Sequence, residues 1–250
     1  MRPEEYSKRQ FVRTFAFGTA STLIGTPWIG SLLLTFAGEQ RAQAASDGRI
    51  ILQLNQFPAL LNEYGSIRVS ITPIEGSYPV GQFFPLIISR ATGNTFYAVN
   101  SSCTHRGCIV NVFDGNSIGC PCHGSEFAID GTVTNGPANE DLQRYSVEFD
   151  AVNTLTITVP GLGYSITATK LENGTSSRIG LQFPTIDQAQ YQLHFRPTTT
   201  AAWTIVPFAT STTGAANNWF VAGDGLPKTI FADRTTPTGF FCISLLVKEV

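Results

Sequence analysis

Two short segments rich in cysteine and histidine constrain this chain more than any other feature. Box one spans residues 103–108 (CTHRGC), and box two spans residues 120–125 (CPCHGS). Together they hold four of the five cysteines and two of the three histidines in the 250 residues. Each box offers a thiol and an imidazole at short spacing, with one cysteine left over. This set fits two Cys and two His on a pair of metals, with the remaining cysteines bridged.

The two boxes resemble those of Rieske iron–sulfur proteins of the cytochrome bc type, which have the form C-x-H-x-G-C and C-P-C-H-G-S. The likeness extends from about residue 50 to residue 159. It includes the segment 57–60 (FPAL), the Asp130-Gly131 turn and the segment 136–138 (GPA). The resemblance implies an all-β domain and one [2Fe–2S] cluster per chain, in which two imidazoles replace two thiolates on one iron.

The resemblance also assigns roles to the individual cysteines and histidines. By position, Cys103 and Cys120 would hold one iron, and His105 and His123 would hold the other. The remaining pair, Cys108 and Cys122, would form a disulfide between the two loops. Imidazole is neutral where thiolate is charged, so this ligand set raises the reduction potential. Rieske centres lie between roughly −150 and +300 mV, against about −400 mV for plant-type clusters.

Three further positions bear on the potential and on docking. Ser125 matches a family serine whose hydroxyl points at the cluster, whereas Phe127 stands where high-potential members have a tyrosine. Because hydrogen bonds to the cluster tune its potential, we expect a lower potential than in relatives with both hydroxyls. Arg106 replaces a residue that is usually apolar, which favours an anionic partner surface or is simply a solvated tip residue. The segment 136–138 matches a third loop that covers the cluster.

Two other metal chemistries compete for the same residues. Six Cys and His at these spacings could furnish a four-ligand zinc site in an exported binding module. A Rieske oxygenase needs a second iron held by two histidines and a carboxylate. After His105 and His123 only His194 remains, so the chain cannot build that second site.

The N-terminus has the features of an export signal. Residues 7–12 (SKRQFV) resemble a twin-arginine motif in which lysine replaces the first arginine, and residues 14–38 carry no charge. Arg41 precedes residues 42–44 (AQA), a small-residue cleavage pattern. We therefore assign residues 1–45 to a Tat-type signal or a membrane anchor, because an uncharged hydrophobic helix of this length could span a bilayer. The rest of the chain would lie on the extracytoplasmic (periplasmic) face of a bacterial cytoplasmic membrane, anchored or released.

Sparse charge, abundant Gly and Thr, and frequent turn signals predict an all-β body. Residues 46–160 would form the Rieske domain. The polar stretch 170–177 would be a hairpin turn or linker, and residues 175–250 would form a small β-sandwich of unknown role. The expected strands are 50–54, 67–71, 86–89, 96–99, 109–113, 117–120, 147–149, 155–159, 181–186, 191–195, 203–206, 219–222 and 241–247.

Two residues outside the boxes carry chemistry of their own. His194 alternates with Tyr191, Leu193 and Phe195, so we expect it on the polar, solvent-facing side of a strand. Cys242 is expected to be a lone thiol in a half-buried strand.

These observations predict an electron-transfer subunit rather than a stand-alone enzyme. The leading interpretation is a subunit of a membrane quinol:acceptor oxidoreductase, with a quinol as candidate donor and a periplasmic electron acceptor. The alternative is the Rieske subunit of a periplasmic molybdenum oxidoreductase. The near-zero net charge of −2 gives no indication of nucleic-acid binding.

Overall fold

The structure is a computed structural model that describes residues 11–15, 47–71, 85–173, 176–233 and 239–250. Nearly all of these residues lie in strands or loops. The helical segments among them are two short 3₁₀ turns, η2 (Leu54–Gln56) and η3 (Pro58–Leu61). The predicted all-β class is confirmed. Within the described ranges, no helix has the length and apolar character needed to cross a membrane.

The predicted N-terminal helix and cleavage site fall mainly on residues outside the described ranges. Of this region the structure describes β1 (Phe11–Phe15), which pairs antiparallel with two strands far apart in the sequence. Phe11 lies opposite Lys248, and Arg13 lies opposite Ile51. The export signal and the anchor stay predictions.

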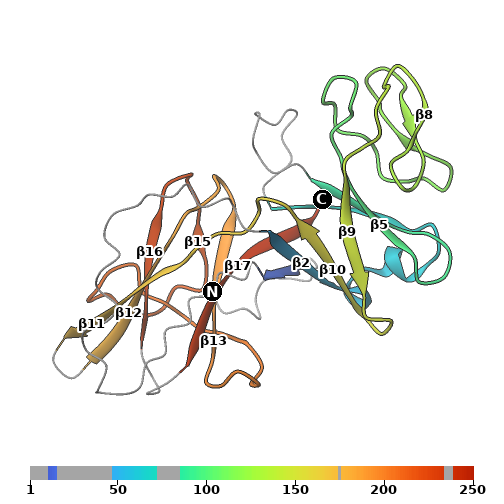
Figure 1. Cartoon of the computed structure of the whole chain (residues 1–250). Coiled ribbons are helices and arrows are strands. Elements are labelled where there is room, and N and C mark those ends of the chain that lie inside the picture. The colour runs from blue at the N-terminus through green and yellow to red at the C-terminus, as the bar shows by residue number, and fades with distance from the viewer. Residues whose placement is uncertain (1–10, 16–46, 72–84, 174–175, 234–238) are drawn as a thin grey trace, which may run out of the picture.

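The largest sheet closes on itself. Eight of its strands run in the order β1, β2 (Gly48–Gln53), β10 (Thr154–Val159), β9 (Arg144–Phe149), β5 (Phe96–Asn100), β4 (Leu86–Arg90), β3 (Ser66–Ser70) and β17 (Phe240–Glu249). Because β1 pairs with both β2 and β17, these strands form an antiparallel barrel. Figure 1 shows β2, β10, β9 and β5 around its interior.

Alternating side chains explain why these segments pair as they do. In β10 the residues Leu155, Ile157 and Val159 are buried, and the intervening threonines are half-buried. Leu155 lies opposite Leu52, and Ile157 lies opposite Ile50, so apolar residues of both strands face the barrel interior. Burial of these alternate residues stabilises the pairing and fixes its register.

Between β5 and β9 the chain leaves the barrel and forms the tip subdomain, residues 101–143, which contains both boxes. It holds a small sheet of β6 (Ile118–Gly119), β7 (Glu126–Phe127) and β8 (Val133–Asn135). Figure 1 shows it projecting beyond β5 and β9. A second, separate core lies beneath the boxes and consists of Ile87, Val99, Cys103, Val110, Phe113, Ile118, Cys120, Phe127, Ala138 and Leu142.

The C-terminal region forms two sheets that pack face to face, as a sandwich requires. One sheet consists of β11 (Thr167–Asn173), β12 (Ser176–Phe183) and β16 (Lys228–Asp233). The other contains β13 (Gln190–Arg196), β14 (Thr204–Ile205), β15 (Val221–Ala222) and the first part of β17. Their shared core includes Ile179, Leu181, Phe183, Tyr191, Leu193, Ile230, Ile243 and Leu245.

One strand joins the barrel to the C-terminal sheets. Residues 240–245 of β17 pair with β13, whereas Lys248 and Glu249 pair with β3 of the barrel. A single core also contains buried residues from both parts. The boundaries 46–160 and 175–250 stay predictions, and the sheets on their two sides are continuous through β17.

Most predicted strands are confirmed, with some shifts at their ends. The stretch 170–177 is a hairpin rather than a linker, because β11 and β12 pair with Lys170 opposite Ile179. The prediction of a strand at 109–113 was wrong. Within this segment only Ile109 makes a β-bridge, an isolated one to Ser102. The strands β1, β7, β8, β11 and β16 were not predicted.

The prediction for His194 was wrong. Its side chain is buried with 0% exposure, and its Nε2 lies 2.8 Å from the Ser244 hydroxyl of β17. The alternation with Leu193 suggested a solvated face, but both faces of β13 are covered, since Gln192 is buried as well. Cys242 lies opposite His194 and is more deeply buried than expected. Burial raises the pKa of its thiol to about 11.

Candidate metal centre

The two boxes fold into loops with the same backbone hydrogen bonds. In box one the Cys103 N–H donates to the Cys108 carbonyl at 2.7 Å, and the Gly107 N–H donates to the Cys103 carbonyl at 2.7 Å. In box two the equivalent bonds run from Cys120 to Ser125 at 2.8 Å and from Gly124 to Cys120 at 3.1 Å. Each box therefore closes on itself over six residues.

Glycine at the fifth position makes this closure possible. Gly107 has φ +77° and Gly124 has φ +76°, a left-handed conformation that other residues rarely adopt. The shared glycine of the two boxes is thus a backbone requirement of the loop.

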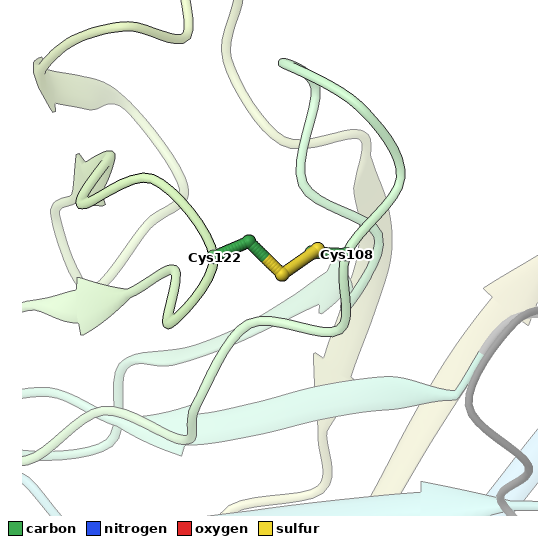
Figure 2. Close-up of a disulfide and its surroundings, with 2 residues drawn as sticks. All are labelled: Cys108 and Cys122. Atoms are coloured by element: carbon green, nitrogen blue, oxygen red, sulfur yellow. A yellow bond between two sulfur atoms is a disulfide. The ribbon is translucent and has the colours of Figure 1, made fainter.

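A disulfide links the two loops, as the resemblance implied. Cys108 and Cys122 are bonded, with their Cα atoms 6.5 Å apart. Figure 2 shows the bridge spanning the space between the two loops. Cys108 is half-buried and Cys122 is exposed, so the disulfide lies near the surface. It holds each box against the other independently of any metal.

The two remaining box cysteines lie together in the interior. Cys103 is 2% exposed and Cys120 is 4% exposed. Burial raises the pKa of the Cys103 thiol, and the adjacent Cys120 thiol raises it further. The His105 amide and the Ser125 hydroxyl lower that pKa by hydrogen bonding to the sulfur. Two thiols, with donors already directed at one of them, are a suitable ligand pair for a soft metal centre.

The two box histidines also lie side by side. Their ring centroids are 4.8 Å apart, and the rings meet edge to face. The His105 Nδ1 is buried and has no hydrogen-bond partner among the described residues. Burial lowers the pKa of His105, and the charges of His123 and Arg106 lower it further. The shift favours the neutral imidazole, the form that ligates metals.

The unpartnered Nδ1 tests whether the residues fit a metal cluster. A buried polar atom without a partner is costly and calls for an explanation, of which an ion is one. A metal at His105 Nδ1 would satisfy it. Among the residues described, no three His, Cys, Asp or Glu side chains are grouped to hold a single metal ion. A [2Fe–2S] cluster needs only two protein ligands per iron, so the four box residues fit it.

The third loop is attached to both boxes. The Ala138 N–H donates to the Ser125 hydroxyl oxygen at 2.9 Å, and the Thr104 hydroxyl donates to the Glu140 carbonyl at 2.6 Å. The Gly136-Pro137 peptide in this loop is cis. The loop is thus placed where a covering role requires it, and covering of a cluster stays a prediction.

Sequence reasoning missed the residues that secure this loop. Arg144 lies 3.2 Å from the Asp130 carboxylate and 3.3 Å from that of Asp141, and so joins the start of β9 to two turns of the tip subdomain. The Thr104–Glu140 and Arg144–Asp130 contacts carry no spacing signal, because the partners are distant in sequence, and the short Arg144–Asp141 spacing does not by itself indicate a loop contact. Phe127 is fully buried in the tip core, and Arg106 is exposed.

Comparisons with known proteins agree with this geometry. Residues 75–146 match the family model described as the Rieske [2Fe-2S] domain. The chloroplastic cytochrome b6-f complex iron-sulfur subunit of Bigelowiella natans is 50% identical over 68 residues, which is 26% of this chain and 27% of that protein. The subunit of the same name from Synechococcus sp. (strain JA-2-3B'a(2-13)) is 46% identical over 59 residues, 23% of this chain and 34% of that protein.

A solved structure also matches part of the chain. The cyanobacterial plasma membrane Rieske protein PetC3 from Synechocystis PCC 6803 is 37% identical, with 32% of this chain and 81% of that chain covered and a TM-score of 0.27. The matches to the curated relatives span only 27–39% of those proteins' lengths. Residues 75–146, which hold both boxes, therefore belong to the Rieske [2Fe–2S] domain family.

Proposed function

We propose that this chain carries one electron at a time through a [2Fe–2S] cluster held by Cys103 and Cys120 on one iron and by His105 and His123 on the other. The observation that carries the proposal is the buried, unpartnered Nδ1 of His105 beside the His123 ring. The adjacent buried thiols supply the other half of the ligand set.

When bound, the cluster would supply a one-electron couple of moderate to high potential. The chain's own residues determine how that couple is used. Cys103 and Cys120 lie in the tip core, which excludes water from the thiol side. His123 is exposed, so its ring is the ligand that a redox partner would touch. Ser125 binds the third loop through Ala138, and its hydroxyl proton remains available to the Cys103 sulfur.

The leading version of this function is a subunit of a membrane quinol:acceptor oxidoreductase of the cytochrome bc type. It is supported by relatives that are named subunits of the cytochrome b6-f complex. In this version the donor is a quinol, the acceptor is periplasmic, and the N-terminal segment provides the anchor on the extracytoplasmic side.

A second version is the Rieske subunit of a periplasmic molybdenum oxidoreductase. Two observations favour it. Arg106 is exposed beside the His105 ring, so a cation stands at the face that would enter an apolar quinol pocket. Phe127 is buried in the tip core and offers no hydroxyl to the cluster. Charge at the tip disfavours an apolar site and favours an acidic partner surface.

Electron paramagnetic resonance of the dithionite-reduced, purified protein tests the cluster itself. The expected result is a Rieske-type signal, with two irons and two acid-labile sulfides per chain. A chain that binds zinc and gives no signal after maturation in a cluster-assembling host would overturn the proposal. Co-purification from native membranes then decides between the versions: cytochrome b supports the first, and a molybdenum subunit supports the second.

A further inference from the structure

Side chains on the outward face of β3 form hydrogen bonds with residues 109–119, the segment that connects the two boxes. Ile67 and Val69 point into the barrel core, whereas Ser66 and Arg68 alternate with them on the opposite face. The Arg68 guanidinium donates to the Val110 carbonyl, and the Ser66 hydroxyl oxygen accepts the Phe113 N–H at 3.2 Å. The first half of the connecting segment is thereby attached to β3 at two points, Val110 and Phe113.

From Arg68 a chain of hydrogen-bonded peptide groups leads into box two. The carbonyl that accepts from Arg68 belongs to the peptide group between Val110 and Asn111. The N–H of this same group donates to the Gly119 carbonyl at 2.8 Å. The peptide group that follows Gly119 then donates its own N–H, that of Cys120, to the Ser125 carbonyl at 2.8 Å.

The peptide groups in this chain are aligned. In each trans peptide the oxygen and the hydrogen point in opposite directions, so a group that accepts at one end and donates at the other has its dipole along the chain. Hydrogen bonds in series polarise one another. The Arg68 cation lies at the negative end, and the positive end, the Cys120 N–H, points at the Ser125 carbonyl within box two.

The backbone of Arg68 is held on both sides. On one side β3 pairs with β4, with Arg68 opposite Ile87. On the other side the Arg68 carbonyl accepts the Val250 N–H at 3.0 Å, next to the β3–β17 pairing. Strand β17, which comes from the C-terminal sheets, therefore helps to fix the residue at which the peptide chain starts.

We propose that Arg68 is a positioning residue for the cluster: through the Val110–Asn111 and Gly119–Cys120 peptide groups it holds box two in place and raises the reduction potential of the cluster. The inference rests on the proposed function, because it concerns the potential of that cluster. A positive potential near a redox centre favours the added electron, and the last N–H of this series belongs to Cys120, a proposed ligand. Removing the Arg68 cation therefore lowers the reduction potential.

Three substitutions grade the contribution of Arg68. Arg68→Lys keeps a charge and a donor, Arg68→Gln keeps a donor only, and Arg68→Met keeps neither. The expected order of midpoint potentials, measured by protein-film voltammetry, is wild type, then Lys, then Gln, with Met lowest. In hydrogen-exchange mass spectrometry, peptides containing the Asn111 and Cys120 amides should exchange faster in Arg68→Met than in wild type.

Arg90 offers a matched control. Arg90 is the last residue of β4, the strand that pairs with β3, and its guanidinium also donates to backbone carbonyls, those of Leu60, Leu61 and Gly93. None of these three residues lies in the boxes. Arg90→Met is expected to leave the potential and the exchange of the box amides unchanged.

The possible outcomes separate this inference from the proposed function. A wild-type protein without a Rieske signal would refute the function before any variant is compared. A wild-type signal together with equal potentials and equal exchange in Arg68→Met overturns the role of Arg68, as does an equal shift in Arg90→Met. If Arg68→Met does not fold, equal potentials for the Lys and Gln variants overturn it.

Discussion

The tip subdomain and the C-terminal sheets both bury cysteine, but for different physical reasons. In the tip, Cys103 and Cys120 lie in a small core beneath irregular loops, which are held by backbone hydrogen bonds and one disulfide. In the C-terminal sheets, Cys242 lies on the ten-residue strand β17, whose neighbours belong to a large apolar core. The tip core thus contains candidate metal ligands, whereas the C-terminal core consists mainly of packed apolar side chains.

This difference shows how the chain separates reactivity from stability. Strand β17 is buried from Cys242 to Val247, so we expect the large core around it to contribute more to the free energy of unfolding than the small tip core does. The tip loops have few apolar residues, so polar contacts and covalent links must define their geometry. We therefore expect substitutions in the tip to alter the cluster, and substitutions in the C-terminal core to alter global stability.

The largest expected effect comes from replacing one buried cysteine in each of the two environments with alanine. Cys120→Ala should abolish cluster binding, because in the proposed ligand set one iron would lose one of its two protein ligands. Cys242→Ala should leave the cluster intact, because its thiol lies in the C-terminal sheet. The visible absorption and the iron content of the two purified variants check this. Loss of iron from Cys242→Ala, or a normal spectrum for Cys120→Ala, would contradict the separation.

The next effect concerns the C-terminal core. Leu193 is fully buried between the two C-terminal sheets, so Leu193→Ala should lower the free energy of unfolding by about 2–5 kcal/mol. Urea unfolding measures the loss, and the electron paramagnetic resonance line shape of the folded variant should not change. Leu226→Ala is the control, because Leu226 is 65% exposed. A line shape altered by Leu193→Ala would show that the two regions are not separable.

The disulfide tests how the tip is held. Replacing both Cys108 and Cys122 with serine should destabilise the cluster-free protein by up to about 3 kcal/mol, the chain-entropy value for a loop of roughly 15 residues. The loss should be smaller with the cluster bound, because the proposed ligands come from both loops and would link them a second time. Thermal unfolding of both forms measures the difference. Equal losses in both forms would argue against cross-linking of these loops by the cluster.

The smallest expected effect is a hydroxyl added to the tip core. Phe127→Tyr should raise the reduction potential by about 20–60 mV, if one hydrogen bond favours the reduced cluster by about 0.5–1.5 kcal/mol. Phe113→Tyr is the control, because Phe113 belongs to the same core but its ring lies against Tyr64. Voltammetry of both variants gives the comparison. If the reduction potential of Phe127→Tyr does not rise, the missing hydroxyl is not the reason for a low potential.

The sequence was sufficient for much of the fold because strand patterns are local. Alternation in β10 and the apolar run of β4 marked their strands, and each lies within a residue of its expected place. The segment 109–113 looked equally apolar, but its amides bond to Ser101, Gly119 and Ser66, which are not arranged as one neighbouring strand. A side-chain pattern cannot report where backbone groups find their partners.

By itself the sequence indicated a cysteine–histidine ligand set, since few residue types bind iron, and it contained the glycines that close both loops. Only the tertiary structure decided that His194 is buried against Ser244, that β17 is shared between the barrel and the C-terminal sheets, and that Arg68 meets Val110. Ligand type and backbone freedom are properties of single residues. Burial and long-range hydrogen bonds depend on segments that meet only when the whole chain has folded.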